Sequence, residues 1–225
     1  MNAQQLALQR ELLEELEWEP RLDASRIEVA VAHDGVVTMT GVVNSFAAKV
    51  AAERAIKRVR GVLAVVNDLD VKLPTSHART DTQIGEAVVR ALEWDVLVPH
   101  EKIHARVSDG WVRLEGEVDW NYQRTAAEEA VHRLTGVKGV TNLVTVLPQA
   151  AGEDVKTRED VKTAIEAALR RSAEVEAQNI EVATHHGNVV LRGRVHSWAE
   201  RDAAEAAAWA APGVATLDDR LQVEP

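Results

Sequence analysis

Each of three alanine-rich stretches carries a basic residue four positions before a glutamate, the spacing of neighbours on one helix face. The pairs are Lys49 with Glu53, Arg124 with Glu128, and Arg201 with Glu205. With the cation first, such a pair adds about 0.2–0.5 kcal/mol or less to helix stability. Two explanations of its recurrence stay open: inheritance from one ancestral repeat, or an anion contact made by Lys49, Arg124 and Arg201.

The other residues capable of chemistry are not arranged for catalysis. The chain has no cysteine, which excludes disulfides, thiolate metal ligands and cysteine nucleophiles. Its histidines are scattered, and the spacing of His100 and His104 falls beside an expected strand rather than on a helix. No phosphate-binding glycine loop and no G-x-S-x-G motif occur. The sequence therefore predicts no catalytic residue, no metal site and no cofactor.

The elements that hold these pairs belong to a threefold repeat. Segments that begin at His33, Ser108 and His185 align without a gap, and each helix contains the pentad A-A-E-x-A. Glycines coincide at a turn, at a strand position that indicates a bulge or a close backbone approach, and at the end of a helix. In this order the three sets are Gly35, Gly110 and Gly187; Gly41, Gly116 and Gly193; and Gly61, Gly136 and Gly213.

Hydrophobic periodicity gives the elements of each copy. A row of apolar residues at i, i+4 and i+8, such as Leu8, Leu12 and Leu16, predicts a first helix. Alternation such as Ile27, Val29 and Val31 predicts a strand, followed by a tight hairpin, a second strand, the alanine-rich helix and a third strand. We therefore predict an α+β protein of three α-β-β-α-β repeats at 1–74, 81–148 and 157–225, with linkers at 74–81 and 148–159.

Six tryptophans stand out in a chain with a single phenylalanine. Trp198 lies where Phe46 lies in the first copy, and it either fixes the entry to its helix or forms an aromatic patch for a lipid or a partner. Trp111 and Trp209 are out of phase with the core, which favours contacts between repeats or an external interface. Trp18 and Trp94 end their first helices, where we expect them to pack locally. The candidate interface residues are Phe46, Trp111, Trp120, Tyr122, Trp198 and Trp209.

The order of elements and motifs in each copy resembles the BON domain, named for bacterial osmotically induced and nodulation proteins. That order is a hairpin, S-W-A-E-R, A-A-E-x-A, Gly-Val and a final strand. The third copy is the most similar, and the first has an apparent extra residue around Asn67 and Asp68. The resemblance implies a small sheet backed by two helices in each copy, three-stranded and mixed. It also implies a bacterial, non-enzymatic protein of the osmotic stress response.

Composition narrows the expected partners. The net charge of −10 argues against nucleic acid, and no apolar run is long enough to span a membrane. The charged N-terminal segment lacks the apolar core of a signal peptide, so we expect a cytoplasmic protein, peripheral to the inner membrane at most. From the resemblance, the expected function is phospholipid binding through repeated surfaces. Alternatives are a protein scaffold, with homo-oligomers among the options, or a potassium sensor.

Overall fold

The computed structural model describes residues 3–32, 34–147, 158–173 and 175–224. The first repeat contains α1 (Ala3–Glu17), β1 (Ile27–Val31), β2 (Val36–Val43), α2 (Phe46–Arg58) and β3 (Ala64–Val71). The second contains α3 (Asp81–Trp94), β4 (Ile103–Ser108), β5 (Trp111–Val118), α4 (Asn121–His132) and β6 (Gly139–Val146). The third contains α5 (Arg158–Arg171), β7 (Ile180–His185), β8 (Asn188–Val195), α6 (Trp198–Trp209) and β9 (Thr216–Val223).

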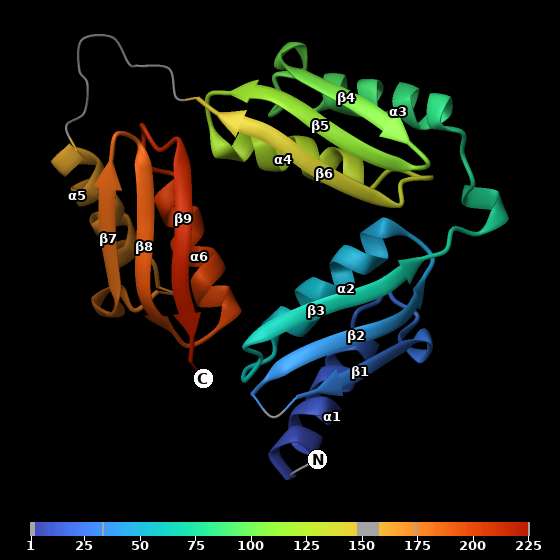
Figure 1. The fold of residues 1–225 in the computed structure, drawn as a ribbon, viewed down its shortest axis with the longest axis horizontal. Coiled ribbons are helices and arrows are strands. Elements are labelled where there is room, and N and C mark those ends of the chain that lie inside the picture. Colours follow the sequence, from blue (N-terminus) through green and yellow to red (C-terminus); the bar gives the residue numbers. More distant parts are fainter. Residues whose placement is uncertain (1–2, 33, 148–157, 174, 225) are drawn as a thin grey trace.

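The chain order of the elements produces the same mixed sheet in every repeat. The first two strands pair antiparallel, and the third lies parallel beside the second, in the orders β1-β2-β3, β4-β5-β6 and β7-β8-β9. A parallel neighbour requires a crossover connection, which the alanine-rich helices α2, α4 and α6 supply. Both helices of a repeat cover one face of its sheet (Figure 1). The predicted α+β fold of three small mixed sheets, each backed by two helices, is confirmed.

The strand register makes the third strands equivalent residue by residue. Val36 pairs with Ala64, Trp111 with Gly139 and Asn188 with Thr216, so the separation is the same in each repeat. The expected extra residue near Asn67 and Asp68 is therefore wrong. Residue types alone do not align the third strands correctly. The strand register places Asn67, Asn142 and Asp219 at one equivalent position.

A glycine in the second strand is required by close backbone approach, as predicted. Gly116 has φ of +145°, and a Cβ there would lie 2.1 Å from the carbonyl oxygen of Lys102. Gly41 and Gly193 meet the carbonyl oxygens of Arg26 and Asn179 in the same way. That carbonyl ends a short 3-10 helix before the first strand (η1 Ala24–Arg26, η3 His100–Lys102, η4 Ala177–Asn179), an element that the hydrophobic pattern does not reveal.

The predicted hairpins are also present. Asp109 and Gly110 have φ of 53° and 82°, and His186 and Gly187 have φ of 47° and 79°. Positive φ at both central residues matches a two-residue turn whose twist fits the flanking strands. The first linker contains a further 3-10 helix, η2 (Thr75–His77), whereas residues 148–157 of the predicted second linker lie outside the described residues.

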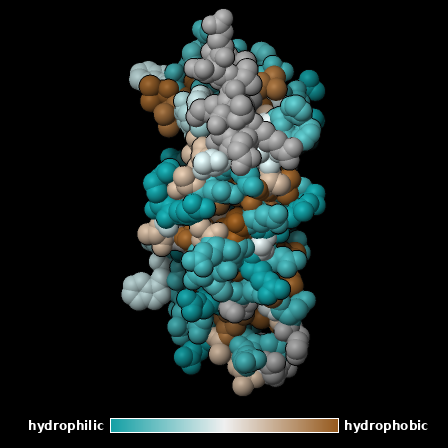
Figure 2. Space-filling view, turned by 90° about the vertical axis from the view of Figure 1, so that its left-hand side faces the viewer, coloured by the Kyte–Doolittle hydropathy of each residue, from teal (hydrophilic) through white to brown (hydrophobic). Residues whose placement is uncertain are grey.

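Each repeat has its own hydrophobic core between its helices and its sheet. The predicted helix rows are buried, as for Leu12 and Leu16 in α1 and Ile84 and Val88 in α3. Alanines such as Ala52 are fully buried, because small side chains let the crossover helix approach the sheet closely. Figure 1 shows the three repeats beside one another, with α2, α4 and α6 on their inner sides. The face in Figure 2 is mostly hydrophilic, with apolar residues in separate small patches.

Candidate functional site

Trp198 joins the third repeat to the first. Its indole Nε1 donates a hydrogen bond of 3.0 Å to the carbonyl oxygen of Val62, and its ring packs against the first core. Lys57 and Arg201 each lie 4.9 Å from the ring centroid, close enough for cation–π attraction. Ser197 caps α6, accepting from the amide of Glu200 at 3.1 Å. Trp198 thus attaches α6 to the first repeat, whereas the role of its ring in fixing its own helix entry stays a prediction.

Two further aromatic candidates also lie between repeats. Phe46 packs against the second core, and Trp209 packs against both the second and the third cores. The guanidinium of Arg124 lies 5.1 Å from the Trp209 ring centroid. For Trp209, the alternative of a contact between repeats is therefore confirmed. We call the junction formed by Phe46, Trp198, Trp209 and their partners on α2, α4 and α6 the hub.

Polar contacts complete the hub. Arg54 of α2 lies 3.3 Å from the carboxylate of Glu129 on α4, which links the first two repeats. Burial lowers the pKa of His132 on α4, and the nearby positive charge of Arg54 acts in the same direction, so the imidazole stays neutral at pH 7. Asn121 occupies the position of Phe46 and Trp198, and its Oδ1 is the single buried side-chain polar atom without a partner within the described residues.

The three repeated basic residues all have partners within the protein. Lys49 donates from Nζ to the carbonyl oxygen of Leu69 at 2.9 Å, and Arg124 covers Trp209. Arg201 pairs with Asp219 and lies 3.6 Å from the carboxylate of Glu205. The cation therefore serves internal contacts in each repeat, and an additional anion contact stays a prediction.

The remaining candidate aromatics lie on the outside of the second repeat. The ring of Trp111 lies over Gly139 of the neighbouring strand, where an added Cβ would be 2.3 Å from the ring. Trp111 therefore packs on its own sheet and stays more than half exposed. Trp120 and Tyr122, at the start of α4, stack with ring centroids 6.5 Å apart and are also exposed.

The two most exposed large apolar side chains among the described residues, Trp94 and Val96, lie at the end of α3 and just after it. Trp94 is 87% exposed, Val96 96% and Leu97 53%. We call these three residues the second-repeat tip. Trp18, the equivalent of Trp94, is also exposed, so the prediction that Trp18 and Trp94 pack locally is wrong. The chain after Trp18 reads Glu-Pro-Arg instead of Asp-Val-Leu, and therefore only the second repeat carries an apolar cluster at this place.

The sequence contained a signal for the tip that periodicity missed. The apolar row of α3 ends at Leu92, and Val98 is buried again beyond it. Trp94, Val96 and Leu97 are apolar residues between these two core positions, outside any helical or strand period. Large apolar residues without a place in the core indicate an interaction surface.

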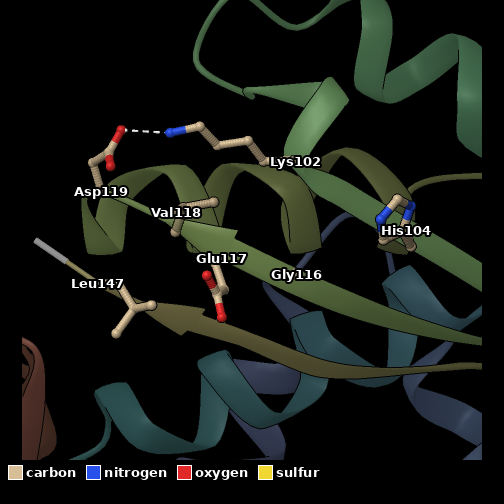
Figure 3. Close-up of a pocket in the computed structure, with 7 residues that line it drawn as sticks. All are labelled: Lys102, His104, Gly116, Glu117, Val118, Asp119 and Leu147. Carbon is tan, nitrogen blue, oxygen red and sulfur yellow. Dashed lines mark hydrogen bonds and ion pairs between the residues drawn. The ribbon is translucent and has the colours of Figure 1, made fainter. Parts of the chain in front are cut away.

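A shallow cavity of about 640 Å³ lies at the same end of the second repeat. Its lining combines charged and apolar groups: Lys102, His104, Gly116, Glu117, Val118, Asp119 and Leu147. Lys102 Nζ lies 2.9 Å from Asp119 Oδ2, and Leu147 lies across the strand end from this pair (Figure 3). The ion pair ties the segment after the tip to the residue before Trp120, which places the tip and the Trp120–Tyr122 stack around one end of the sheet.

The described part of the chain shows neither a metal site nor a membrane-spanning helix. It contains no group of three or more histidine, aspartate or glutamate side chains placed to hold a metal ion. Among the described helices, none combines the length and the apolar character needed to cross a bilayer.

Comparison with known proteins adds a relative and two solved structures. The chain is 32% identical over 111 residues to osmotically-inducible protein Y of Escherichia coli K12, covering 48% of this chain and 55% of the relative. It thus spans about half the length of that curated relative. The C-terminal domain of CdsD from the Chlamydia trachomatis type III secretion system gives a TM-score of 0.26 at 12% identity, over 96% of both chains. The PrgH periplasmic domain gives 0.22 at 8% identity, over 88% of this chain and 95% of that chain.

The family model gives a direct assignment. The model of the BON domain matches three times, at residues 5–72, 80–148 and 157–225. Each match covers one set of two helices and three strands with the required glycine in its second strand. The chain belongs to the BON domain family and carries three copies of the domain.

Proposed function

We propose that this protein is a non-enzymatic binding protein that attaches peripherally to phospholipid membranes through the second-repeat tip. The observation that carries the proposal is the exposure of Trp94, Val96 and Leu97 next to one another in the chain. A tryptophan beside aliphatic side chains suits the boundary between headgroups and acyl chains, where an indole keeps its N–H hydrated and buries its ring.

The expected affinity is low. Burying a side chain of the size of valine or leucine contributes about 1.5–3 kcal/mol. Partial insertion of the three tip residues thus gives on the order of 5 kcal/mol, which corresponds to a dissociation constant of roughly 10⁻⁴ M in accessible lipid. Attachment of this strength is reversible, as for a protein with a single short acyl chain.

Charge also shapes the expected lipid preference. The net charge of −10 opposes approach to an anionic surface, and salt screens this repulsion within about 10 Å at 0.1 M. We therefore expect vesicles of neutral phosphatidylcholine to bind the protein at least as well as vesicles containing phosphatidylglycerol, with the difference largest at low salt.

Co-sedimentation with both kinds of vesicle tests the proposal. Replacing Trp94 by alanine and Val96 by aspartate should each lower the partition coefficient about tenfold, because each removes at least ~1.4 kcal/mol of apolar transfer. Trp18→Ala is the matched control: it removes an equally exposed indole without apolar neighbours and should change binding little. Binding that survives at the wild-type level in both tip variants contradicts the proposal. The proposal is also contradicted if the wild type binds no vesicle. In that case the alternative function of this surface is contact with a partner protein in a scaffold.

The similarity to osmotically-inducible protein Y supports a role under osmotic stress. We expect the amount of this protein to rise after a salt upshift in its host cell, measured by quantitative immunoblotting against a housekeeping protein. A constant amount across the upshift would remove this part of the proposal and leave membrane attachment untouched.

A further inference from the structure

Three equivalent positions of the repeats form a polar triad of one cation, one glutamate and one third-strand residue. In the first repeat, Nδ2 of Asn67 donates to the carboxylate of Glu53 at 3.2 Å and to the carbonyl oxygen of Lys49 at 3.3 Å. In the second repeat, Asn142 donates to Glu128 at 3.1 Å and to the carbonyl oxygen of Arg124 at 2.9 Å. An amide group thus supplies both hydrogen bonds in these two triads.

The third repeat has Asp219 at this position, and a carboxylate has no N–H to donate. One oxygen of Asp219 accepts from the Nε of Arg201, and the other accepts from the amide of Leu221 at 2.8 Å. The carboxylate of Glu205 lies 3.6 Å from the same Nε. Two carboxyl groups therefore share one guanidinium, with Asp219 only 10% exposed and Glu205 37% exposed. Close carboxylates on a partly buried site favour binding of a proton between them.

The glutamates of the first and third triads have pKa shifts of opposite direction, and two exchanges contribute: Asp219 replaces Asn67, and Trp209 replaces Lys57. In the first repeat burial favours the neutral carboxyl, but the hydrogen bonds from Lys57 and Asn67 outweigh it and lower the pKa of Glu53. In the third repeat, burial raises the pKa of Glu205 to about 7, and its hydrogen bond with Asp219 and the charge of Asp219 add to this effect. Arg201 opposes the shift without cancelling it.

The carboxyl pair lies between the two attachments of the third repeat. Arg201 and Asp202 face Glu205 from its own helix, Asp219 faces it from β9, and Arg124 acts on it from α4 of the second repeat. Arg201 also covers Trp198, which holds the first repeat, and Arg124 covers Trp209. A change of charge at Glu205 therefore acts on cations that stack on both hub tryptophans.

We propose that Glu205 and Asp219 bind one shared proton, and that release of this proton loosens the attachment of the third repeat to the hub. With the proton bound, the neutral Glu205 donates to Asp219 in place of the amide found in the other repeats. After release, two negative carboxylates compete for Arg201 and draw it away from the ring of Trp198. The ligand in this proposal is the proton, and the carboxyl pair changes between its protonated and deprotonated forms near neutral pH.

The direction of the pH effect follows from linkage. The folded protein holds the Glu205 proton more tightly than the unfolded chain, whose glutamate titrates near 4.5. The contribution of this proton to stability is thus fully present at acidic pH, falls as pH rises from about 4.5, and is lost above about 7. The folded third repeat should be less firmly attached at pH 8 than at pH 6.

The test uses the residue exchange that the chain itself contains. Asp219→Asn restores the amide of the sister repeats, and the pKa of Glu205 should then fall from about 7 toward its ordinary value, as followed by NMR of its carboxyl carbon. Asn142→Asp is the reciprocal variant: it removes the amide donor from Glu128 and gives the second repeat the same pair of carboxyl groups. Both variants place a residue that already folds at an equivalent position, so loss of structure does not obscure the result.

The indole N–H resonance of Trp198 reports the attachment itself. In the wild type this resonance should shift with a midpoint near pH 7, and the melting temperature should fall between pH 6 and pH 8. In Asp219→Asn the resonance should not shift, and the melting temperature should fall less over the same pH range. Trp198→Phe assigns the resonance. An indole resonance that is unchanged across pH 7, or that titrates equally in Asp219→Asn, overturns the proposal.

Discussion

Replacing Trp198 by alanine is predicted to uncouple the third repeat from the first. The substitution removes the ring from the first core and leaves the carbonyl oxygen of the buried Val62 without its donor. It also removes the ring on which Lys57 and Arg201 stack. Because the effect falls on the junction, the secondary structure of each repeat should remain while cooperativity between repeats declines.

The contacts set the expected magnitude. An unsatisfied buried carbonyl costs about 1–3 kcal/mol. Each cation–π contact contributes about 0.5–1 kcal/mol, and the half-buried ring adds about 2 kcal/mol of apolar transfer. We expect a loss of about 4–7 kcal/mol in the free energy of unfolding. Trp198→Phe, which copies Phe46, keeps most of the packing and should lose about 1–2 kcal/mol.

Urea unfolding followed by far-ultraviolet circular dichroism measures both quantities. The wild type should unfold in one main transition, and Trp198→Ala should show an earlier phase with a smaller dependence on urea, since that slope scales with the surface exposed. A loss below about 1 kcal/mol in Trp198→Ala, with one unchanged transition, would refute the role assigned to Trp198 at the hub.

Three further substitutions follow from the structure. Gly116→Ala should destabilise the second repeat by more than about 3 kcal/mol because its Cβ would lie 2.1 Å from the carbonyl oxygen of Lys102, and a melting temperature near the wild-type value would contradict this. Gly85→Ala, in the interior of α3 with nothing within 4 Å of the new Cβ, should instead stabilise by about 0.5–1 kcal/mol in the same thermal melt. Asn121→Phe should raise stability by about 1 kcal/mol because it removes a buried unpaired oxygen where two repeats carry aromatics, and a lower melting temperature would show that the site lacks room.

The repeat and its glycines were accessible from sequence because they are local. Three gapless copies with coinciding glycines predict one backbone conformation, and a glycine shared at one strand position indicates the close approach found at Gly116. The phase of Trp209 likewise predicted a contact beyond its own repeat, and the side chain packs against the second core as well as the third. Such inferences need only the period of a helix or a strand.

The partners of the contacts between repeats were not accessible in this way. The partner of Trp198 is Val62, far away in the chain, and hydrophobic period carries no information on which repeat lies beside which. The prediction that Trp94 packs locally rested on its place at the end of a helix, where an aromatic residue usually packs on that helix. In the structure Leu92 and Val98 complete the core, and Trp94 stays exposed. Asp219 was missed because its equivalence to Asn67 depends on strand register.

A probe at the second-repeat tip tests membrane attachment most directly. The chain has no cysteine, so Val96→Cys provides a unique site for an environment-sensitive nitrobenzoxadiazole label, and Ala173→Cys places the same label at the equivalent exposed position of the third repeat. Added phosphatidylcholine vesicles should shift the emission of the Val96 label to shorter wavelength and raise its intensity, while the Ala173 label stays unchanged. An unchanged Val96 label under conditions where the protein sediments with vesicles would contradict insertion of the tip.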